Sequence, residues 1–489
     1  MSLYKKLFKQ TAIYGIATVL PRMLSFLLVR LYTDYLPKEE YGEVSIIFSY
    51  LIFFNVVLTY GMETAFFRFY NKENSSDSKN KESVVSTAMV SLLASTFAFL
   101  GVSLLFREQI SILTEISIDY LSYTIWILVI DTLAVIPFAK LRAESRPIKY
   151  AVIKIANVAI NLGLNVFFLA FLPKLAQNSN TLFNSIYIEN FQIGYIFVSN
   201  VIASLFTLIV LLPDYFKIKW NFDKQLWKKM FNYGFPILIA GIAFAINEHF
   251  DKILLEKMGV SLADVGAYSA CYKIGMFMVL FRTAYTLGIE PFFFSHSNNE
   301  NAPQTYAEIT KYFVIFGSFM SLGIIVFADI LKNVLVPNSD YWNAMDVVPI
   351  IVIANFFLGI YTNLSVWYKL IDKTKIGAYI SLIGAAVTLI INFLLIPSIS
   401  FLGSAIATIL AYGSMMIISY KLGQKEYPIP YDKQKIGFYL ILSIVLSGIS
   451  FYVPILRETY VFGVISLLIF IYFVYRNEKA LILRILKRN

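Results

Sequence analysis

The sequence has little charge, little histidine and almost no cysteine. Only 15% of its 489 residues are charged, whereas a soluble domain has about 25%. By contrast, 58% are hydrophobic and the mean hydropathy is +0.68. This composition excludes a soluble globular protein and predicts a protein embedded in a bilayer. Two His and one Cys exclude a zinc cluster and a disulfide framework, so we expect neither a metal nor another cofactor.

Long apolar stretches fill most of the chain. A helix that spans a membrane needs about 20 mostly apolar residues, and fourteen stretches meet this requirement. The sequence therefore predicts an all-α polytopic membrane protein with both ends on one side. The first stretch follows three lysines and lacks a small-residue cleavage site, so we interpret it as a retained helix and not a signal peptide. The stretches are 11–31, 44–67, 84–106, 119–141, 149–172, 191–212, 231–250, 264–288, 309–331, 345–368, 376–397, 401–420, 436–454 and 459–475.

Lys and Arg are distributed unevenly between the predicted loops. If the N-terminus is cytoplasmic, 29 of the 41 basic residues fall in cytoplasmic loops and ends. Positive charge marks the cytoplasmic side of a membrane protein, so both termini are expected in the cytoplasm. Seven basic residues fall in the outer loops: Lys38, Arg107, Lys174, Lys252, Lys257, Lys332 and Arg457.

The chain repeats itself at an offset of roughly 220 to 230 residues. Equivalent stretches lie six helices apart, so the halves would be parallel and related by an axis along the membrane normal. The alternative is that the two halves are similar by chance, because apolar sequences use few residue types. The repeat predicts an N-terminal lobe (1–212), a basic connection at the inner membrane surface (213–230), a C-terminal lobe (231–422), and two extra helices with a basic tail (423–489). The matches are Tyr14-Gly15 with Tyr233-Gly234, 61–67 with 288–294, and Lys140-Leu141 with Lys369-Leu370.

Five basic residues remain inside the predicted spans: Arg22, Arg30, Lys154, Lys273 and Arg282. Each costs roughly 2.5 to 3.5 kcal/mol at a helix centre, so they require water or anions. Arg30 and Lys154 lie near span ends and could reach the headgroups. Arg22 and Lys273 lie deeper. Lys273 and Arg282 are nine residues apart on roughly opposite faces, so they can line one cavity only if the eighth helix is broken.

A polar stripe follows the fifth span. Lys154, Asn157, Asn161 and Asn165 recur at helical spacing and share one face. This face predicts either a hydrated cavity or hydrogen bonds between helices. Ser381, Thr388 and Asn392 form a weaker version in the eleventh span.

The acidic candidates are Glu63 and Asp131 within spans and Asp34 just outside the first one. Protonation or cation binding at any of them would couple transport to an ion gradient. A static salt bridge is the alternative role.

Because cations outnumber acids inside the membrane, the residues favour an anionic substrate. Arg suits phosphate because its guanidinium donates two hydrogen bonds at once, and a pyrophosphate carried on a lipid fits this cavity, although composition does not choose it over other anions.

Three short motifs carry a family resemblance. The chain resembles the polysaccharide-type flippases of the multidrug/oligosaccharidyl-lipid/polysaccharide (MOP) exporter superfamily, most specifically in residues 14–70 and loosely over twelve helices. By motif, Arg22 is similar to the basic residue of their first helix and Arg68 to the basic end of their second. The assignment of Lys273 and Arg282 to the site rests on their charge alone. The motifs are Pro21-Arg22-Met23-Leu24-Ser25-Phe26, Tyr32-Thr33-Asp34-Tyr35-Leu36-Pro37 with Glu40-Tyr41-Gly42, and Gly61-Met62-Glu63-Thr64-Ala65-Phe66-Phe67-Arg68-Phe69.

The resemblance implies two six-helix lobes around a cavity. It further implies a monomer in the bacterial cytoplasmic (inner) membrane that moves undecaprenyl-pyrophosphate-linked oligosaccharide to the outer leaflet by alternating access. The product would be a surface polysaccharide such as O-antigen, capsule or exopolysaccharide. Expected partners are this lipid-linked glycan, membrane lipids and polysaccharide polymerase machinery, but no nucleic acid.

Two alternatives remain open. A flippase for the peptidoglycan lipid precursor would share the fourteen helices and basic residues. A membrane polymerase or ligase of lipid-linked glycans would need a substantial outer loop with reactive side chains, and none is visible. The drug-cation branch of the superfamily is disfavoured because a cation site requires carboxylates where this chain has Arg22.

Overall fold

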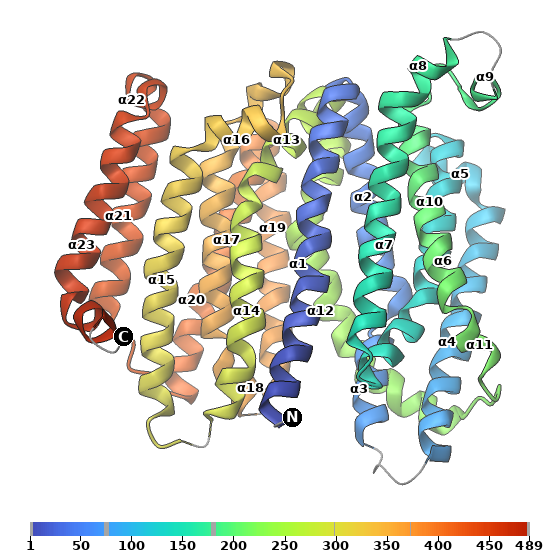
Figure 1. The fold of residues 1–489 in the computed structure, drawn as a ribbon, viewed down its shortest axis with the longest axis horizontal. Coiled ribbons are helices and arrows are strands. Elements are labelled where there is room, and N and C mark those ends of the chain that lie inside the picture. Colours follow the sequence, from blue (N-terminus) through green and yellow to red (C-terminus); the bar gives the residue numbers. More distant parts are fainter. Residues whose placement is uncertain (1–2, 73–77, 178–181, 298, 372, 487–489) are drawn as a thin grey trace. The chain divides into compact units, whose positions relative to one another are not determined.

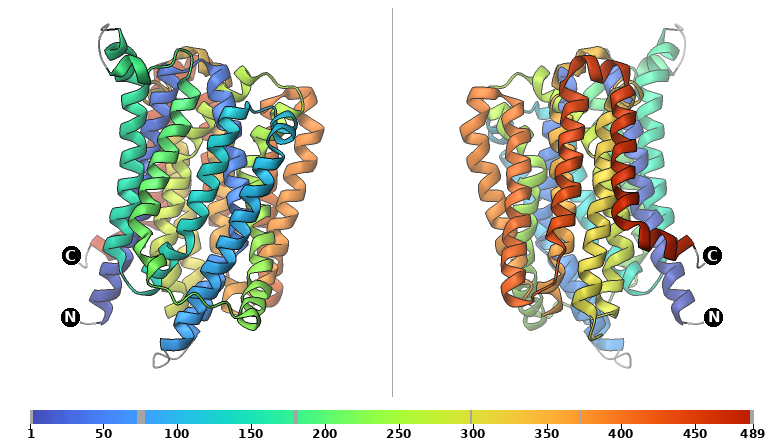
Figure 2. Two further views of the ribbon diagram at one scale, coloured as in Figure 1. Left: turned by 90° about the vertical axis from the view of Figure 1, so that its right-hand side faces the viewer. Right: turned by 90° about the vertical axis from the view of Figure 1, so that its left-hand side faces the viewer.

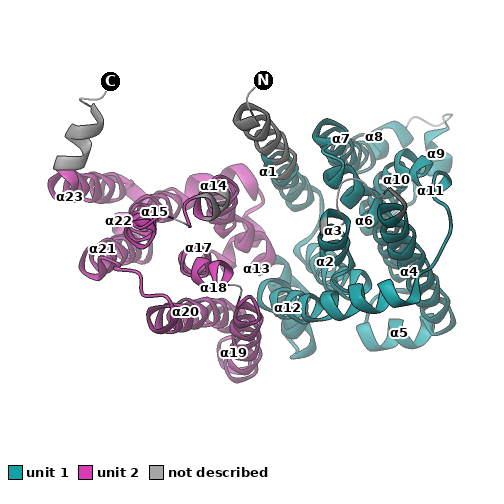
Figure 3. Ribbon diagram, turned by 90° about the horizontal axis from the view of Figure 1, so that it is seen from below, with its two compact units in different colours: residues 1–266 teal, residues 267–489 magenta. Residues whose placement is uncertain are grey.

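A computed structural model describes residues 3–72, 78–177, 182–297, 299–371 and 373–486, and every regular element within these ranges is a helix (Figure 1). The prediction of an all-α membrane protein is therefore confirmed. The chain forms two compact units, residues 1–266 (unit 1) and 267–489 (unit 2), coloured separately in Figure 3. The predicted lobe boundary at 213–230 stays a prediction.

Unit 1 contains the helices of the predicted first six spans and the seventh. Its elements are α1 (Leu3–Tyr35), α2 (Lys38–Thr59), α3 (Met62–Lys72), α4 (Ser78–Leu105), α5 (Arg107–Thr114), α6 (Ile118–Ala143), α7 (Pro147–Val166), η1 (Phe167–Phe171), α8 (Leu172–Ala176), α9 (Phe183–Ile186), α10 (Gln192–Leu211), α11 (Pro213–Phe216) and α12 (Lys224–Lys257).

Unit 2 begins within α13 and contains the remaining helices. Its elements are α13 (Leu262–Gly275), α14 (Phe277–Ser295), α15 (Ala302–Val326), α16 (Ala328–Leu335), η2 (Ser339–Ala344), α17 (Val347–Leu364), α18 (Val366–Leu370), α19 (Lys375–Ile399), α20 (Phe401–Glu426), α21 (Lys433–Tyr452), α22 (Pro454–Thr459) and α23 (Val461–Leu486).

Twelve segments of the described chain are long and apolar enough to cross a membrane. Each corresponds to a predicted span. The first predicted span falls in α1, and the eighth is divided between α13 and α14, where only Phe277–Ile289 forms a shorter apolar helix. The count of fourteen stays a prediction.

Several helices extend beyond their predicted bounds. The seventh span was expected to end at residue 250, but α12 continues to Lys257 and so contains Lys252 and Lys257, which were assigned to an outer loop. The ninth span was expected to begin at residue 309, but α15 begins at Ala302. α12 continues because apolar residues resume after its charged residues, and Lys252 forms an ion pair with Asp251.

Side-chain caps fix where several helices begin. Asp223 accepts hydrogen bonds from the backbone of Gln225 and Leu226 and so starts α12 at Lys224. Ser117 caps α6 in the same way through Tyr120. The cap at Asp223 matters for function because it sets the rotation of the basic and aromatic residues in the first turns of α12.

α2 packs closely along α12 within unit 1. The rings of Phe53 and Phe250 lie 5.7 Å apart. At the turn after α2, Gly61 has a φ of +71°, and a Cβ there would lie 2.3 Å from the carbonyl oxygen of Gly234. Only glycine fits this turn, because any side chain would clash with the backbone of α12. The glycine pair therefore sets how closely α2 approaches α12.

The last two long helices attach to α15 through a buried carboxylate. Glu478 of α23 contacts Lys435 of α21 at 2.6 Å and Lys311 of α15 at 3.5 Å. Figure 2 shows α21 and α23, in red, running beside one another in unit 2. The two helices outside the predicted repeat are thus tied to the second half by an ion-pair network.

Candidate functional site: basic residues within the helices

In unit 1, basic residues gather where α3, α6 and α12 come together. The guanidinium of Arg68 lies 4.2 Å from the ring centroid of Tyr233. Arg142 of α6 donates a short hydrogen bond to Glu63 of α3 and lies 4.6 Å from the ring of Phe67. Cation–ring contacts of this kind hold a guanidinium in place while leaving its edge able to donate hydrogen bonds. Glu63 therefore has a structural partner that the sequence did not reveal, since Arg142 was counted only as a loop cation.

Lys154 and Asp131 share the interior of unit 1. The ammonium of Lys154 on α7 lies 4.4 Å from the ring centroid of Phe138 on α6. Asp131, also on α6, interacts electrostatically with Lys154 and hydrogen-bonds with Ser204 of α10. A charge pair inside a membrane protein lowers the cost of burying either group alone. Lys154 thus has the charge of Asp131 acting on it inside unit 1, and its approach to the headgroups stays a prediction.

The asparagines of the polar stripe make contacts between and within helices. Asn157 of α7 donates to the Ala203 carbonyl at 2.9 Å and to the Thr207 hydroxyl at 3.0 Å, both on α10. Asn161 and Asn165 are buried, and the Asn165 amide donates to the Asn161 side chain at 2.9 Å. The Asn157 bonds join the fifth and sixth predicted spans. They are the contacts expected of the interhelical alternative.

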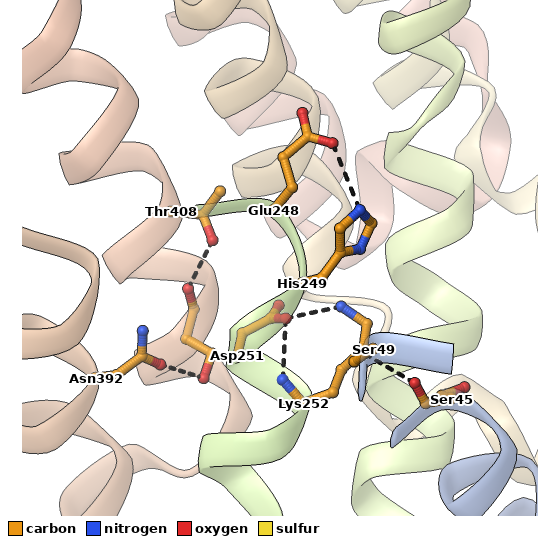
Figure 4. Close-up of polar contacts among 9 residues, drawn as sticks. Ser45, Ser49, Glu248, His249, Asp251, Lys252, Asn392 and Thr408 are labelled. Carbon is orange, nitrogen blue, oxygen red and sulfur yellow. Dashed lines mark hydrogen bonds and ion pairs between the residues drawn. The ribbon is translucent and has the colours of Figure 1, made fainter. Parts of the chain in front are cut away.

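The equivalent helix pair of unit 2 is joined in a similar way. Ser404 of α20 donates to the side-chain oxygen of Asn392 on α19 at 2.6 Å, and both residues are buried. Figure 4 shows Asn392 with Thr408 further along α20. Asn392 belongs to the weaker polar stripe noted in the sequence. An asparagine thus contacts the neighbouring helix both in the pair α7 and α10 and in the pair α19 and α20.

Arg22 and Asp34 both lie on α1 and both have exposed side chains. Arg22 follows Pro21, which lies inside the helix, and its carbonyl accepts a hydrogen bond from Ser25 at 2.6 Å. α1 packs along α7, the helix that carries Lys154. Arg30, nearer the other end of α1, is exposed as well.

The eighth predicted span is interrupted in unit 2. α13 ends at Gly275 and α14 begins at Phe277, with Met276 as a turn between them. Lys273 and Arg282 lie on opposite sides of this break, and each is half-buried. These two residues could line one cavity only if the helix were broken, and the structure shows the break. The side chain of Arg282 packs beside Gly359 of α17, where the missing Cβ leaves room for the ring of Phe313.

One turn beyond Arg282, polar side chains line a small pocket in unit 2. The Tyr285 hydroxyl donates to Asn363 of α17 at 2.5 Å, and Thr286 and Lys369 line the same pocket. Sequence reasoning treated Lys369 only as a loop cation and a marker of the repeat. Lys369 lies on α18, directly after α17, and the pocket also includes residues of α14, which is far from both in the chain.

The sequence analysis also missed charged residues near the end of α12. Asp251 and Lys252 are buried and form an ion pair of 2.8 Å, and Glu248 contacts His249 at 3.9 Å (Figure 4). Asp251 and Lys252 were missed because they lie just beyond the predicted end of the span at residue 250, and Glu248 and His249, within it, were not considered as candidates. The signal that could have found them is the apolar pair Leu254-Leu255 that follows.

Sequence comparison identifies two matching families. The polysaccharide biosynthesis protein family matches residues 7–287, more than half of the chain, and the MatE family matches residues 236–394. A probable low-salt glycan biosynthesis flippase, Agl15 of Haloferax volcanii, is 22% identical over 243 residues, covering 48% of this chain and 51% of that protein. An uncharacterized membrane protein of Methanocaldococcus jannaschii is 25% identical over 240 residues, covering 46% of each chain. The chain thus matches about half the length of these relatives.

Comparison of structures identifies two similar folds. The lipid II flippase MurJ in an inward closed conformation has a TM-score of 0.72 at 16% identity, covering 95% of this chain and 99% of MurJ. An inward-facing multidrug resistance MATE family transporter of the MOP superfamily has a TM-score of 0.67 at 12% identity, covering 88% of this chain and 95% of that one. The relatives whose names state an activity are flippases and transporters, and this argues against the polymerase or ligase alternative.

Proposed function

The chain belongs to the polysaccharide biosynthesis protein family and has the fold of the MOP superfamily, and from this premise we propose that it is a flippase for lipid-linked oligosaccharide. Its substrate would be an undecaprenyl-pyrophosphate-linked repeat unit, moved from the cytoplasmic to the outer leaflet by alternating access. One observation carries the proposal: the family match, residues 7–287, contains all five basic residues of the predicted spans.

The side chains suit a pyrophosphate. Arg22 and Arg282 can each donate paired hydrogen bonds to phosphate oxygens, and Lys273 adds a point charge. Arg68 is held over Tyr233 at the end of its helix, where it would meet the substrate headgroup first. We assign Lys154 and Asn157 supporting roles, because Asp131 interacts electrostatically with Lys154 and Asn157 donates a hydrogen bond to α10. Asn161 supports the same helix face. Of the acidic residues, Asp34 is the proposed coupling group, whereas Glu63 and Asp131 keep cations in place.

The test is translocation of a fluorescent lipid-linked oligosaccharide in vesicles that contain the purified protein. We expect Arg22→Ala to slow translocation about tenfold or more, because a hydrogen bond to a charged group is lost, and Arg22→Lys to retain part of the rate. Arg30→Ala, on the same helix, is the matched control and should leave the rate unchanged. An unchanged rate in Arg22→Ala at equal protein level would remove Arg22 from the mechanism.

A lipid II flippase is the second candidate, and the fold shared with MurJ favours it. Both substrates present a pyrophosphate on a polyprenyl chain, so the basic residues would serve either. Depletion of the protein separates the two. Loss of a surface glycan with accumulation of its lipid-linked unit supports the first candidate, and accumulation of lipid II with cell lysis supports the second.

We further propose a monomer in the cytoplasmic membrane with both termini in the cytoplasm. The excess of basic residues in alternate loops supports this orientation. Polysaccharide polymerase machinery would take up the translocated unit on the outer side. Labelling of cysteines introduced at the chain ends, with a reagent that does not cross membranes, tests the orientation.

A further inference from the structure

An apolar groove of about 720 Å³ opens on unit 1 between α4 and the first turns of α12. Tyr60, Ser91, Ala94 and Ser95 line one side, and Trp227 and Phe231 line the other. Its volume lies in the range of sites that bind small molecules. None of these residues belongs to the proposed transport site.

The polar atoms that line the groove already have partners. The Ser91 hydroxyl is 2.6 Å from the Tyr60 hydroxyl and accepts a hydrogen bond from Trp227 at 2.7 Å. Ser95 donates to the Leu92 carbonyl at 3.2 Å. A sugar or peptide placed here would leave its own polar groups without partners, which is costly away from water. The groove therefore suits a hydrocarbon chain.

Stacked rings make the wall of the groove rigid. Trp227 and Phe231 stack with centroids 5.3 Å apart, and Tyr60 lies 6.2 Å from Phe231. Trp and Tyr are the residues enriched at the membrane–water interface. Phe222, also on the lining, and Trp220 are exposed in the segment just before α12. These rings indicate that the groove lies at the depth where acyl chains meet headgroups.

Positive charge surrounds the groove at the start of α12. All five lysines of the 213–230 segment are exposed. Lys224 precedes Trp227 by three residues and Phe231 by seven, and Lys228 precedes Phe231 by three, so both lysines share the helix face of Phe231. The two acids of the segment are engaged elsewhere: Asp214 lies 3.7 Å from Lys140, and Asp223 caps α12. The start of a helix also favours anions.

We propose that this groove binds an anionic phospholipid of the inner leaflet, with one acyl chain against Trp227 and Phe231 and the phosphate near Lys224 and Lys228. The site is independent of the translocated substrate and would anchor α12 to α4 at the inner membrane surface. It requires only that the 213–230 segment lies at that surface.

The experiment uses the full-length protein in nanodiscs that contain phosphatidylglycerol with a photoreactive group on one acyl chain. Irradiation should label peptides that contain residues 90–95 and 222–231. Unlabelled phosphatidylglycerol should compete, and phosphatidylcholine should compete at least fivefold less well. Labelling that both lipids suppress equally would overturn the anionic preference and with it the proposal.

Two pairs of variants make the test specific. Ala94→Trp fills the groove and should reduce labelling at least fivefold, whereas Ala98→Trp, one turn along the same exposed face of α4, should not. Lys228→Gln should weaken the preference for phosphatidylglycerol more than Lys229→Gln, which points away from Phe231. Equal effects within either pair, with unfolding temperatures matched, would contradict the proposal. So would labelling by a photoreactive polyprenyl pyrophosphate alone, because the groove would then serve the substrate.

Discussion

The side chains of Asp251 and Lys252, adjacent in the chain, form an ion pair of 2.8 Å that is buried within α12. Neighbouring residues on a helix normally point in different directions, and here the flexible lysine stem allows its ammonium to reach the preceding carboxylate. Each charge lowers the free-energy cost of burying the other. The pair lies on the helix that packs along α2.

This pair predicts a strong asymmetry between single and double variants. Lys252→Met or Asp251→Asn should each destabilise the protein by about 3 to 5 kcal/mol, because one charge is left buried without its partner. The double variant should recover much of that loss. Thermal unfolding in detergent measures the difference.

Lys257 on the same helix supplies the control. Its ion pair with Glu115 has the same length of 2.8 Å but is partly exposed, so Lys257→Met should cost about 1 kcal/mol or less. Equal losses at Lys252 and Lys257 would show that burial does not determine the strength of these pairs.

The break between α13 and α14 predicts that two basic residues act together in transport. Lys273→Gln and Arg282→Gln should each slow translocation about tenfold or more, since each removes hydrogen bonds to a charged group. If both contact one substrate phosphate group, the double variant should slow translocation by less than the product of the two single effects. Lys375→Gln, an exposed lysine at the start of α19, should behave like the wild type. Rates of the double variant equal to the product of the single effects would place the two residues at separate sites.

Asp329 lies beyond Val326, where the ninth span ends in the structure, and it predicts an acid-dependent loss of stability. Its burial alone would raise the pKa of the carboxyl, but hydrogen bonds from Arg457 and Lys332 outweigh this and hold the pKa below its usual value. Arg457 contacts both carboxylate oxygens, at 2.6 and 2.8 Å. A lowered folded-state pKa contributes stability above the unfolded value of about 3.9 and loses it as the pH falls through the folded value.

We therefore expect Asp329→Asn to unfold at a lower temperature than the wild type at pH 7. The gap should close as the pH falls below about 4, where the wild-type carboxylate also becomes protonated. Unfolding temperatures measured from pH 7 to pH 3 test this. A gap that stays constant across that range would mean that the ion pair contributes nothing to the difference.

Asn157 allows the two interpretations of the polar stripe to be separated. Asn157→Ala removes hydrogen bonds to α10 and should cost about 0.6 to 2 kcal/mol of stability while leaving the translocation rate unchanged. In a double-mutant cycle with Thr207→Val, the two losses should be less than additive. A variant with normal stability but slower translocation would instead place Asn157 in the hydrated cavity.

Much of the architecture follows from the sequence alone. The low charge and the long apolar stretches determine a helical membrane protein, because a bilayer leaves the backbone no partners except those within a helix. The positions of twelve spans follow from hydropathy, and the resemblance in residues 14–70 agrees with the family that matches residues 7–287. These properties are local, so a window of about 20 residues contains the information.

Only the tertiary structure decided which charges have partners. Glu63 with Arg142, and Asp131 with Lys154, are brought together by the packing of α3, α6 and α7. No periodicity in the sequence predicts such a contact, because the contact depends on the rotation of one helix against another. The break at Met276 and the burial of the Asp251–Lys252 pair likewise depend on how the helices pack, which hydropathy alone does not record.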